Sequence, residues 1–486
     1  MLFLGIILTH PNTPITGMAS DTSPPLHQGS DDPLSPANKI YLRSVTGYFT
    51  TIRWLMVWVT QLVFYGIPWL DFGARQAVLF DLSTRRFYIF GLVLYPQDFI
   101  YLTGLLIISA YALFLFTAVA GRLWCGYACP QTVYTEMFLW IEYKVCGDRS
   151  AQIRRSAGPW CFDKVWRVTA KQALWTGLAL WTGLTFVGYF TPIKLLTTGV
   201  WQFQLDAWEL FWILFYGLAT YVNAGFLREQ ICKHMCPYAR FQSAMFDRDT
   251  LIVTYDATRG EPRGKRSRHT DPHGMQLGDC VDCSLCVQVC PVGIDIRHGL
   301  QYECIGCGAC ADVCDTVMRK MAYPTGLVKY TTENALFNGW SKSRIGRHIF
   351  RPRILIYTSI LVVMVTAMIF SLSTRKPFKV DVIRDRGVMV RITDDGHIEN
   401  IYRLQIMNTT ESAQHFQVTV SGLHGLTVLT DDNITVAPAQ SVWTVVRAQL
   451  PPDAAKQGAH RIKFGVESLD TRTQDFEKST FVVPSP

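Results

Sequence analysis

Charged side chains are scarce in this sequence. Of its 486 residues only 17% are charged, whereas 49% are hydrophobic. This scarcity argues against a wholly soluble protein, yet the mean hydropathy of +0.15 is too low for a chain made only of helices in lipid. The length also exceeds the usual size of one domain. We therefore expect a multidomain protein with membrane and soluble parts.

A nucleic-acid-binding motif is also missing, although the net charge is +8. Basic residues collect in the cytoplasmic loops of membrane proteins, which explains the positive charge without a nucleic-acid partner. No DNA-binding or RNA-binding signature supports the other interpretation. We therefore expect the lipid bilayer, and no nucleic acid, among the partners.

Cysteine is absent after Cys314, although the chain has fourteen. A secreted disulfide scaffold is short and spreads its cysteines through its loops. Here twelve lie in tight motifs, and Cys146 and Cys161 stand outside them. Reduced thiols that bind metal are the better interpretation, with these two as ordinary reduced thiols.

The N-terminus lacks the basic segment and the cleavage site of a signal peptide. A polar, Pro/Ser-rich stretch, Asp21–Asn38, predicts a disordered cytoplasmic segment over residues 1–45. Met18 opens that stretch and is a candidate for the true start codon.

Five apolar stretches are candidate membrane spans, and several are rich in Trp and Tyr near their ends. They are Trp54–Leu70, Phe99–Ala120, Ala173–Phe190, Trp208–Phe226 and Ile354–Ser371.

The distribution of Lys and Arg predicts the orientation of these spans. Basic residues are dense in Gly121–Lys171 and after Leu227, but sparse in Thr191–Trp201. By the positive-inside rule this predicts a multi-pass protein of a bacterial inner membrane with its C-terminus in the periplasm. The expected parts are a four-helix membrane region (46–230), a cytoplasmic domain (231–350), a fifth transmembrane helix (351–373) and a periplasmic domain (374–486).

The tail beyond Arg375 has the period of β-strands. Hydrophobic and polar residues alternate there, and turn residues such as Asp394-Asp395-Gly396 separate the alternating stretches. About seven short strands over ~100 residues are typical of an immunoglobulin-like sandwich. The tail carries no catalytic constellation, so we expect an all-β docking or structural module.

Eight cysteines form two runs with the spacing of a bacterial two-cluster ferredoxin, which predicts an α+β domain that relays electrons. The runs are Cys280-x2-Cys283-x2-Cys286-x3-Cys290-Pro291 and Cys304-x2-Cys307-x2-Cys310-x3-Cys314. Each run supplies three thiolates to one 4Fe–4S cluster and its last thiolate to the other. The expected ligands are Cys280, Cys283, Cys286 and Cys314 for one cluster, and Cys304, Cys307, Cys310 and Cys290 for the second. Two structural zinc sites are the alternative, but zinc ribbons rarely use eight cysteines in this doubled spacing.

A second cysteine pattern repeats at the ends of the second and fourth spans. Its copies are Cys125-x3-Cys129-Pro130 and Cys232-x3-Cys236-Pro237, and the second copy contains His234 and Met235. A helix that persists through the motif places both sulfurs on one face, and the proline then bends or ends it. Thiolate, thioether and imidazole together suit copper. A copper site is one interpretation, and thiols packed against lipid headgroups are the other. Whether the four thiols converge stays open.

Two acidic residues follow the first copy of this pattern. Glu136 and Glu142 lie in a segment rich in Tyr, Phe and Trp. A quinone or proton site is one interpretation, but we favour the polar face of an interfacial amphipathic helix.

Three stretches together resemble the FixG/RdxA/CcoG family: Trp124–Glu136, Cys232–Gln242 and the doubled ferredoxin motif. The tail is also similar to that family's C-terminal domain, and the resemblance covers nearly the whole chain after about Tyr41. It implies an accessory factor for assembly of the cbb(3)-type haem–copper cytochrome oxidase. Oxidase subunits and a copper-transporting P-type ATPase are the implied partners.

The same resemblance implies an oxidoreductase that reduces Cu(II) to Cu(I), with copper as its substrate. It carries a copper or redox role onto Cys125, Cys129, Cys232 and Cys236. Two other functions stay open, namely a quinol-linked electron carrier to a periplasmic reductase and an assembly scaffold whose clusters only stabilise the fold. The sequence names neither the electron donor nor the partner of the tail.

Overall fold

The computed structural model describes residues 40–73, 75–268, 276–385, 390–430, 433–452 and 454–484. Met18 and most of the segment expected to be disordered lie outside the described residues. The chain divides between Ile40 and Tyr41, and the unit Tyr41–Pro486 is described below.

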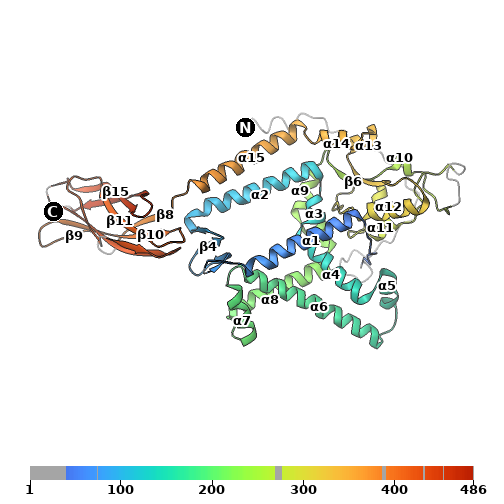
Figure 1. Ribbon diagram of the computed structural model, residues 1–486, viewed down its shortest axis with the longest axis horizontal. Coiled ribbons are helices and arrows are strands. Elements are labelled where there is room, and N and C mark those ends of the chain that lie inside the picture. Colours follow the sequence, from blue (N-terminus) through green and yellow to red (C-terminus); the bar gives the residue numbers. More distant parts are fainter. Residues whose placement is uncertain are drawn as a thin grey trace. The chain divides into compact units, whose positions relative to one another are not determined.

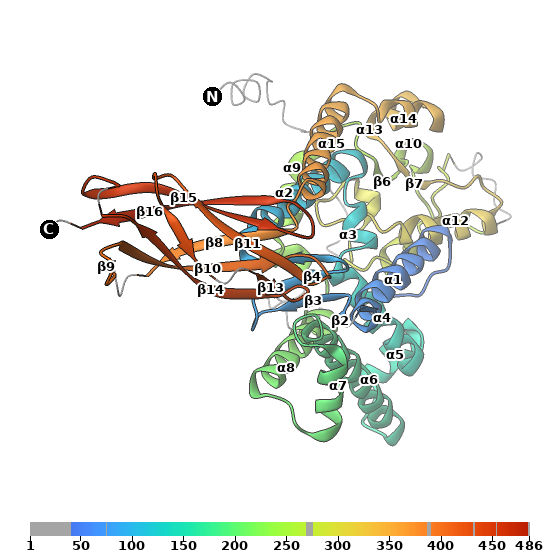
Figure 2. The same ribbon diagram turned by 60° about the vertical axis from the view of Figure 1, so that its left-hand side comes forward.

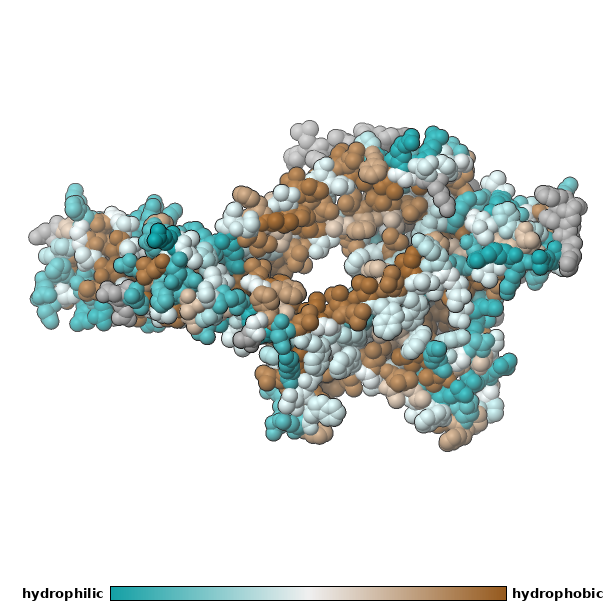
Figure 3. All heavy atoms as spheres, in the orientation of Figure 1, coloured by the Kyte–Doolittle hydropathy of each residue, from teal (hydrophilic) through white to brown (hydrophobic). Residues whose placement is uncertain are grey.

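Among the described residues, three helices are long and apolar enough to cross a membrane. They are Pro96–Ala120, Ala207–Leu227 and Pro352–Ser373. Hydrophobic side chains cover the surface of the helical region in Figure 3, and Leu106, for example, is 61% exposed. Apolar surface of this extent is stable in lipid rather than in water. These helices therefore associate the protein with a membrane.

The expected spans Trp54–Leu70 and Ala173–Phe190 also lie mostly in helices. They are not among the three helices that are long and apolar enough to cross a membrane. Helix α1 (Tyr48–Gly66) ends where Pro68 enters a short 3-10 turn, since proline cannot continue a helix. Helix α6 (Phe162–Val187) begins well before the expected start at Ala173, because the preceding charged residues also fit a helix. The count of five spans stays a prediction.

Helix α8 (Ala207–Val222) forms most of the second of the three apolar helices. The other helical elements of the described chain outside the α+β unit are α3 (Leu123–Tyr127), α4 (Pro130–Cys146), α5 (Arg149–Ala157), α7 (Ile193–Gln202), α9 (Pro237–Met245), α13 (Glu333–Asn338) and α14 (Lys342–His348). The loop after α1 forms strands β1 (Asp71–Phe72), β2 (Arg75–Gln76), β3 (Val78–Asp81), β4 (Arg86–Ile89) and β5 (Leu92–Leu94). Leu79 and Tyr88 of this loop pack against Met407 of the C-terminal domain.

Asp98 joins the C-terminal domain to the membrane helices. It precedes α2 (Phe99–Ala120), which packs beside α15 (Pro352–Ser373) (Figure 1). Its carboxylate is buried and accepts a hydrogen bond from the backbone N–H of Tyr95 at 3.0 Å. It also pairs with Arg375 and Lys379, each at 2.5 Å.

Replacing Asp98 with Ala is expected to loosen this junction. Removing one partner of a buried ion pair costs about 3–5 kcal/mol, because the remaining charges stay buried without a partner. Limited proteolysis between residues 374 and 377 should become faster. The control is Asp475→Ala, which removes only the exposed pair with Lys376 and should change little. Equal cleavage rates in both variants would contradict the role of Asp98 at this junction.

The cysteine-rich part folds as an α+β unit. Strands β6 (Ile252–Tyr255) and β7 (Val328–Thr331) pair antiparallel. Between them lie α10 (Ala257–Gly260), α11 (Leu285–Gln288) and α12 (Ala309–Met321), with Met318 and Leu327 in the core. Because the strands join the two ends of this segment, both cysteine runs are held in one small unit.

The first helix begins on this α+β unit. Gly47, at the N-cap of α1, has no side chain to bind the free amides of the first turn. Asp312 of α12 accepts these bonds instead, from the backbone N–H groups of Phe49 at 3.2 Å and Thr50 at 2.8 Å. A carboxylate in this position also stabilises the helix dipole. A Cβ at Gly47 would lie 2.3 Å from Asp312 Cγ, so the contact requires glycine.

Replacing Asp312 with Ala is expected to cost about 1–2 kcal/mol, the usual loss for an N-cap. The α+β unit should therefore release its clusters at a lower temperature, as followed by visible absorbance of the full chain in detergent. Asp148, which caps the separate helix α5, provides the matched control Asp148→Ala. The same cluster-release temperature in both variants would show that Asp312 has no such role.

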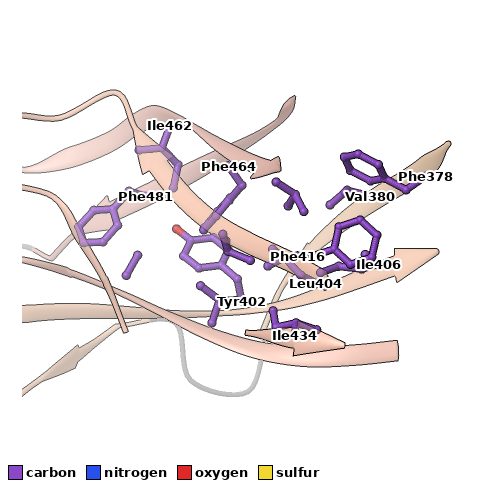
Figure 4. Packing of buried hydrophobic residues seen from close by; sticks show 14 of the residues in the cluster. Phe378, Val380, Tyr402, Leu404, Ile406, Phe416, Ile434, Ile462, Phe464 and Phe481 are labelled. Carbon is purple, nitrogen blue, oxygen red and sulfur yellow. The ribbon is translucent and has the colours of Figure 1, made fainter. Parts of the chain in front are cut away.

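The C-terminal tail is a sandwich of two antiparallel sheets (Figure 2). One sheet has the order β12-β14-β10-β8, with β9 also paired to β10, and the other has the order β13-β11-β15-β16. Tyr402 packs against Phe464 and Phe378 against Phe416 between the sheets (Figure 4). The strands are β8 (Phe378–Arg384), β9 (Arg391–Ile392), β10 (Ile398–Asn408), β11 (Gln414–Ser421), β12 (Thr427–Leu429), β13 (Ile434–Val436), β14 (Ser441–Leu450), β15 (Gly458–Ser468) and β16 (Gln474–Val483).

Candidate iron–sulfur sites and thiol cluster

Two small cavities in the α+β unit are lined by cysteine. The first contains Cys280, Cys283, Cys286 and Cys314. The second contains Cys290, Cys304, Cys307 and Cys310, together with Cys286 from the neighbouring set. The cavities therefore contain the two cysteine sets that the spacing predicts. Their shared residue shows that the sites are adjacent.

The backbone around these cavities provides donors for sulfur. Cys290 accepts hydrogen bonds from the amides of Val292, Gly293 and Ile294, and Cys304 accepts one from Gly306. Gly306 has a φ of +64°, which turns the loop so that its amide faces the sulfur. Amides directed at sulfur suit an anionic iron–thiolate group, so these residues fit a 4Fe–4S cluster.

Burial keeps these thiols protonated unless a metal binds. It raises the pKa of Cys304 and of Cys314 to about 12, and that of Cys286 to about 11. A thiolate ligand therefore forms there only with the positive charge of iron, and cluster binding releases protons.

The two copies of the Cys-x3-Cys-Pro pattern have different backbones. Cys125 lies in α3, whereas Cys232 lies in a π-helical turn, Ile231–Met235. In both copies the second cysteine, Cys129 or Cys236, is an extended N-cap, and the following proline begins a new helix. The helix does not persist through the motif in either copy, because proline at the first helical position favours a helix start.

The structure brings the four motif thiols together, and we call Cys125, Cys129, Cys232 and Cys236 the thiol quartet. Electrostatic interactions connect Cys125 with Cys129 and Cys232, and Cys232 with Cys129 and Cys236. The Cys125 thiol also donates a hydrogen bond to Oε1 of the fully buried Gln242 at 3.3 Å. Burial raises the pKa of Cys125 to about 12 and that of Cys232 to about 11.

The role of Cys125, Cys129, Cys232, Cys236, His234 and Met235 as copper ligands stays a prediction. Within the part of the chain that the structure describes, no three His, Cys, Asp or Glu side chains lie close enough to share a single ion. His234 and Met235 are exposed, and Met235 is 64% accessible. These two residues therefore lie at the solvent edge of the quartet.

Arg122 lies between the quartet and the second cavity. Its guanidinium is buried and interacts electrostatically with Cys125 and Cys232 of the quartet and with Cys304 of the cavity. Its Nη2 donates a hydrogen bond to the backbone carbonyl of Ala239, but its buried Nε has no partner.

Helix α3 packs directly on the loop of the second cavity. An ideal Cβ at Gly126 would lie 2.9 Å from the carbonyl oxygen of Ile305 and 3.0 Å from Cys307 Cα. The Tyr127 hydroxyl donates to the carbonyl of Cys307 at 3.3 Å. Because Cys125 belongs to the same short helix, the quartet and the second cavity are neighbours.

Glu136 and Glu142 have ion-pair partners. Glu136 pairs with Arg53 at 3.1 Å, and Glu142 with Arg228 at 2.7 Å. The expected polar face is wrong for Glu142, which is buried, because Arg228 compensates its charge inside the helical region.

The sequence patterns assign no role to Arg122, Gly126 or Gln242. One pattern could have indicated a role for Arg122, because an arginine precedes the first cysteine in both copies of the repeat. Arg228, in the second copy, instead pairs with Glu142, so the repeat alone does not separate the two roles.

Comparison with known proteins supports the same division of the chain. Residues 227–333 match a family described as a 4Fe–4S dicluster domain, and residues 102–145 match a 4Fe–4S binding domain. Residues 368–484 match the family described as an IG-like fold at the C-terminus of FixG, which confirms the predicted immunoglobulin-like tail.

Curated relatives match most of the chain. Nitrogen fixation protein FixG of Rhizobium meliloti is 37% identical over 80% of this chain and 80% of its own length. In Cereibacter sphaeroides, protein RdxA is 38% identical over 91% of this chain and 94% of its own, and protein RdxB is 39% identical over 83% and 87%. These matches confirm the resemblance noted in the motifs, and the chain belongs to the FixG and RdxA family of iron–sulfur proteins.

Proposed function

We propose that this protein is a membrane-bound electron relay that reduces Cu(II) to Cu(I). The observation that carries the proposal is the contact of α3 with the cysteine loop of the second cavity. It joins an iron–sulfur electron-transfer unit to a set of thiols at the ends of two apolar helices.

In this proposal the two cavities hold one 4Fe–4S cluster each, on the cysteine sets given above. Such clusters carry one electron at a time. The adjacency of the cavities at Cys286 and the packing of Cys125 beside Cys290 and Cys307 support an order of transfer. Electrons pass from the first cluster to the second and then towards the quartet.

Copper binds at the solvent edge of the quartet. Exposed His234 and Met235 offer an imidazole and a thioether beside Cys236, and thioether and thiolate ligands favour Cu(I) over Cu(II). One electron from the relay reduces one Cu(II) to Cu(I), and no bond of the protein breaks.

The density of Lys and Arg supports a cytoplasmic relay in a multi-pass inner-membrane protein with its C-terminal domain in the periplasm. We further propose that the Cu(I) serves assembly of a cbb(3)-type oxidase, with a copper-transporting P-type ATPase as partner. Family membership supports this assignment through the implied role of the family.

The test is anaerobic purification in detergent, reduction with dithionite and titration with Cu(II). Cluster absorbance and EPR should report reoxidation in step with the appearance of Cu(I). A Cys232→Ser/Cys236→Ser variant should lose copper reduction while its α+β clusters persist, and Cys161→Ser should behave as wild type because that thiol is exposed and outside the motifs. Clusters that stay reduced in the presence of copper would refute the reductase and favour a quinol-linked carrier or a scaffold.

A further inference from the structure

A buried arginine lies beside each of the two cysteine-lined cavities. Arg122 packs on the loop of the second cavity, since an ideal Cβ at Gly306 would lie 3.8 Å from its Cβ, and its guanidinium interacts electrostatically with Cys304. Arg297 lines the first cavity, and its side chain is 9% exposed. Buried charges act on their surroundings through protein, which screens them less than water does.

The two arginines differ in the carboxylates around them. Arg297 pairs with Asp282 at 2.5 Å and with Asp295 at 2.6 Å, so this group of three side chains is net negative. Arg122 is 4% exposed, and its Nη2 donates to the backbone carbonyl of Ala239, while its Nε has no hydrogen-bond partner. Within the described part of the chain no carboxylate forms an ion pair with Arg122. The first cavity therefore has a net negative neighbour, and the second has an uncompensated positive one.

Other charged groups near the cavities do not reverse this difference. Arg53 interacts with Cys307, but Glu136 balances its charge at 3.1 Å. Arg266 donates to a backbone carbonyl of the first cavity at 3.3 Å from a partly exposed position, where solvent screens its charge. Asp312 lies on α12 between one cysteine of each set, so it does not favour either cavity.

We propose that Arg122 raises the midpoint potential of the second cluster above that of the first, and that Asp282 and Asp295 lower the potential of the first. Reduction adds one negative charge to a cluster, so a nearby positive charge stabilises the reduced state and a net negative group destabilises it. Protein groups around a cluster are known to set its potential in this way. Arg122 is thus a positioning residue for electrons rather than a ligand.

This charge difference gives the relay a direction. The first cluster is oxidised by one electron and the second is reduced by one, and the transfer is downhill because the second cluster has the higher potential. The inference rests on the iron–sulfur relay of the proposed function, but it does not depend on copper as the final acceptor.

Potentiometric titration followed by EPR measures both midpoints in the full chain, purified anaerobically in detergent. Arg122→Gln should lower the higher midpoint by ~59 mV or more, which is a tenfold change in a one-electron equilibrium, and should leave the lower midpoint in place. Arg122→Lys keeps the charge and should restore most of the shift. Arg248→Gln is the control, because that side chain is 74% exposed. Iron content should be the same in all four proteins.

Asp295→Asn tests the other half of the proposal. The substitution keeps the shape of the side chain but removes its charge, so the lower midpoint should rise and approach the higher one. Asp475→Asn, which removes a carboxylate of the C-terminal domain, is the control. A lower midpoint that stays the same or falls in Asp295→Asn would contradict the role of this carboxylate.

The outcomes for Arg122 are equally distinct. Unchanged midpoints in Arg122→Gln, or a change confined to the lower midpoint, would overturn the proposal. Copper reduction is scored separately on the same samples. Unchanged midpoints with active copper reduction would refute only the charge difference, whereas the expected shifts in a chain that does not reduce copper would refute only the reductase.

Discussion

Cys314→Ala is expected to remove the cluster of the other cysteine run and to stop copper reduction. Cys314 ends the second run, but it lines the cavity of Cys280, Cys283 and Cys286. Its loss leaves three ligands there and all four in the second cavity. In the proposed relay, electrons from the donor enter at the first cluster. Without that cluster, reduction of Cu(II) by electrons from the donor should fall to the uncatalysed rate.

EPR of matched variants checks this crossed arrangement. The reduced spectrum of Cys314→Ala should match that of Cys283→Ala, and Cys290→Ala should match Cys304→Ala. Cys161→Ala should retain both signals. If Cys314→Ala instead resembles Cys304→Ala, each run holds its own cluster and the crossed ligand sets are wrong.

Gly126→Val is expected to separate the thiol quartet from the second cavity without removing the clusters. The new side chain would meet the backbone of Ile305 and Cys307 within 3.0 Å, and backbone cannot move aside as a flexible side chain does. Overpacking costs about 1–3 kcal/mol. This cost lowers the population of molecules in which α3 contacts the cysteine loop by roughly 5- to 150-fold. Electron transfer from the clusters to Cu(II) should slow by a similar factor.

Stopped-flow reoxidation of the dithionite-reduced chain by Cu(II) measures this effect. Gly346→Val is the matched control, because Gly346 has no neighbouring atom within 4 Å of an added Cβ. Iron content should equal that of wild type in both variants. An unchanged reoxidation rate in Gly126→Val would mean that electrons do not cross the contact between α3 and the cysteine loop.

Sequence spacing was sufficient for features set by nearby residues. The two cavities contain the cysteine sets that the ferredoxin spacing predicts, because each set is positioned by a short turn and one return of the chain. The alternation in the tail likewise indicated strands such as β10 and β15, since side-chain direction in a strand follows a period of two.

Features that depend on contacts between residues far apart in the sequence could not be predicted from spacing. The convergence of Cys125 with Cys232 requires two helix ends to meet, and nothing local in either motif specifies that. The capping of α1 by Asp312 joins residues 262 positions apart. Glu142 looked like a surface residue because its buried partner Arg228 lies 86 positions further along the chain.

The cap on α1 also sets an order of events during biogenesis. Thr50 leaves the ribosome long before Asp312, so the start of the first helix has no cap until α12 has been synthesised. Asp312 lies between Cys310 and Cys314, two of the thiols that line the cavities of the α+β unit. Docking of the first helix therefore waits until the α+β unit, the last part of the chain that contains cysteine, has been synthesised and has folded.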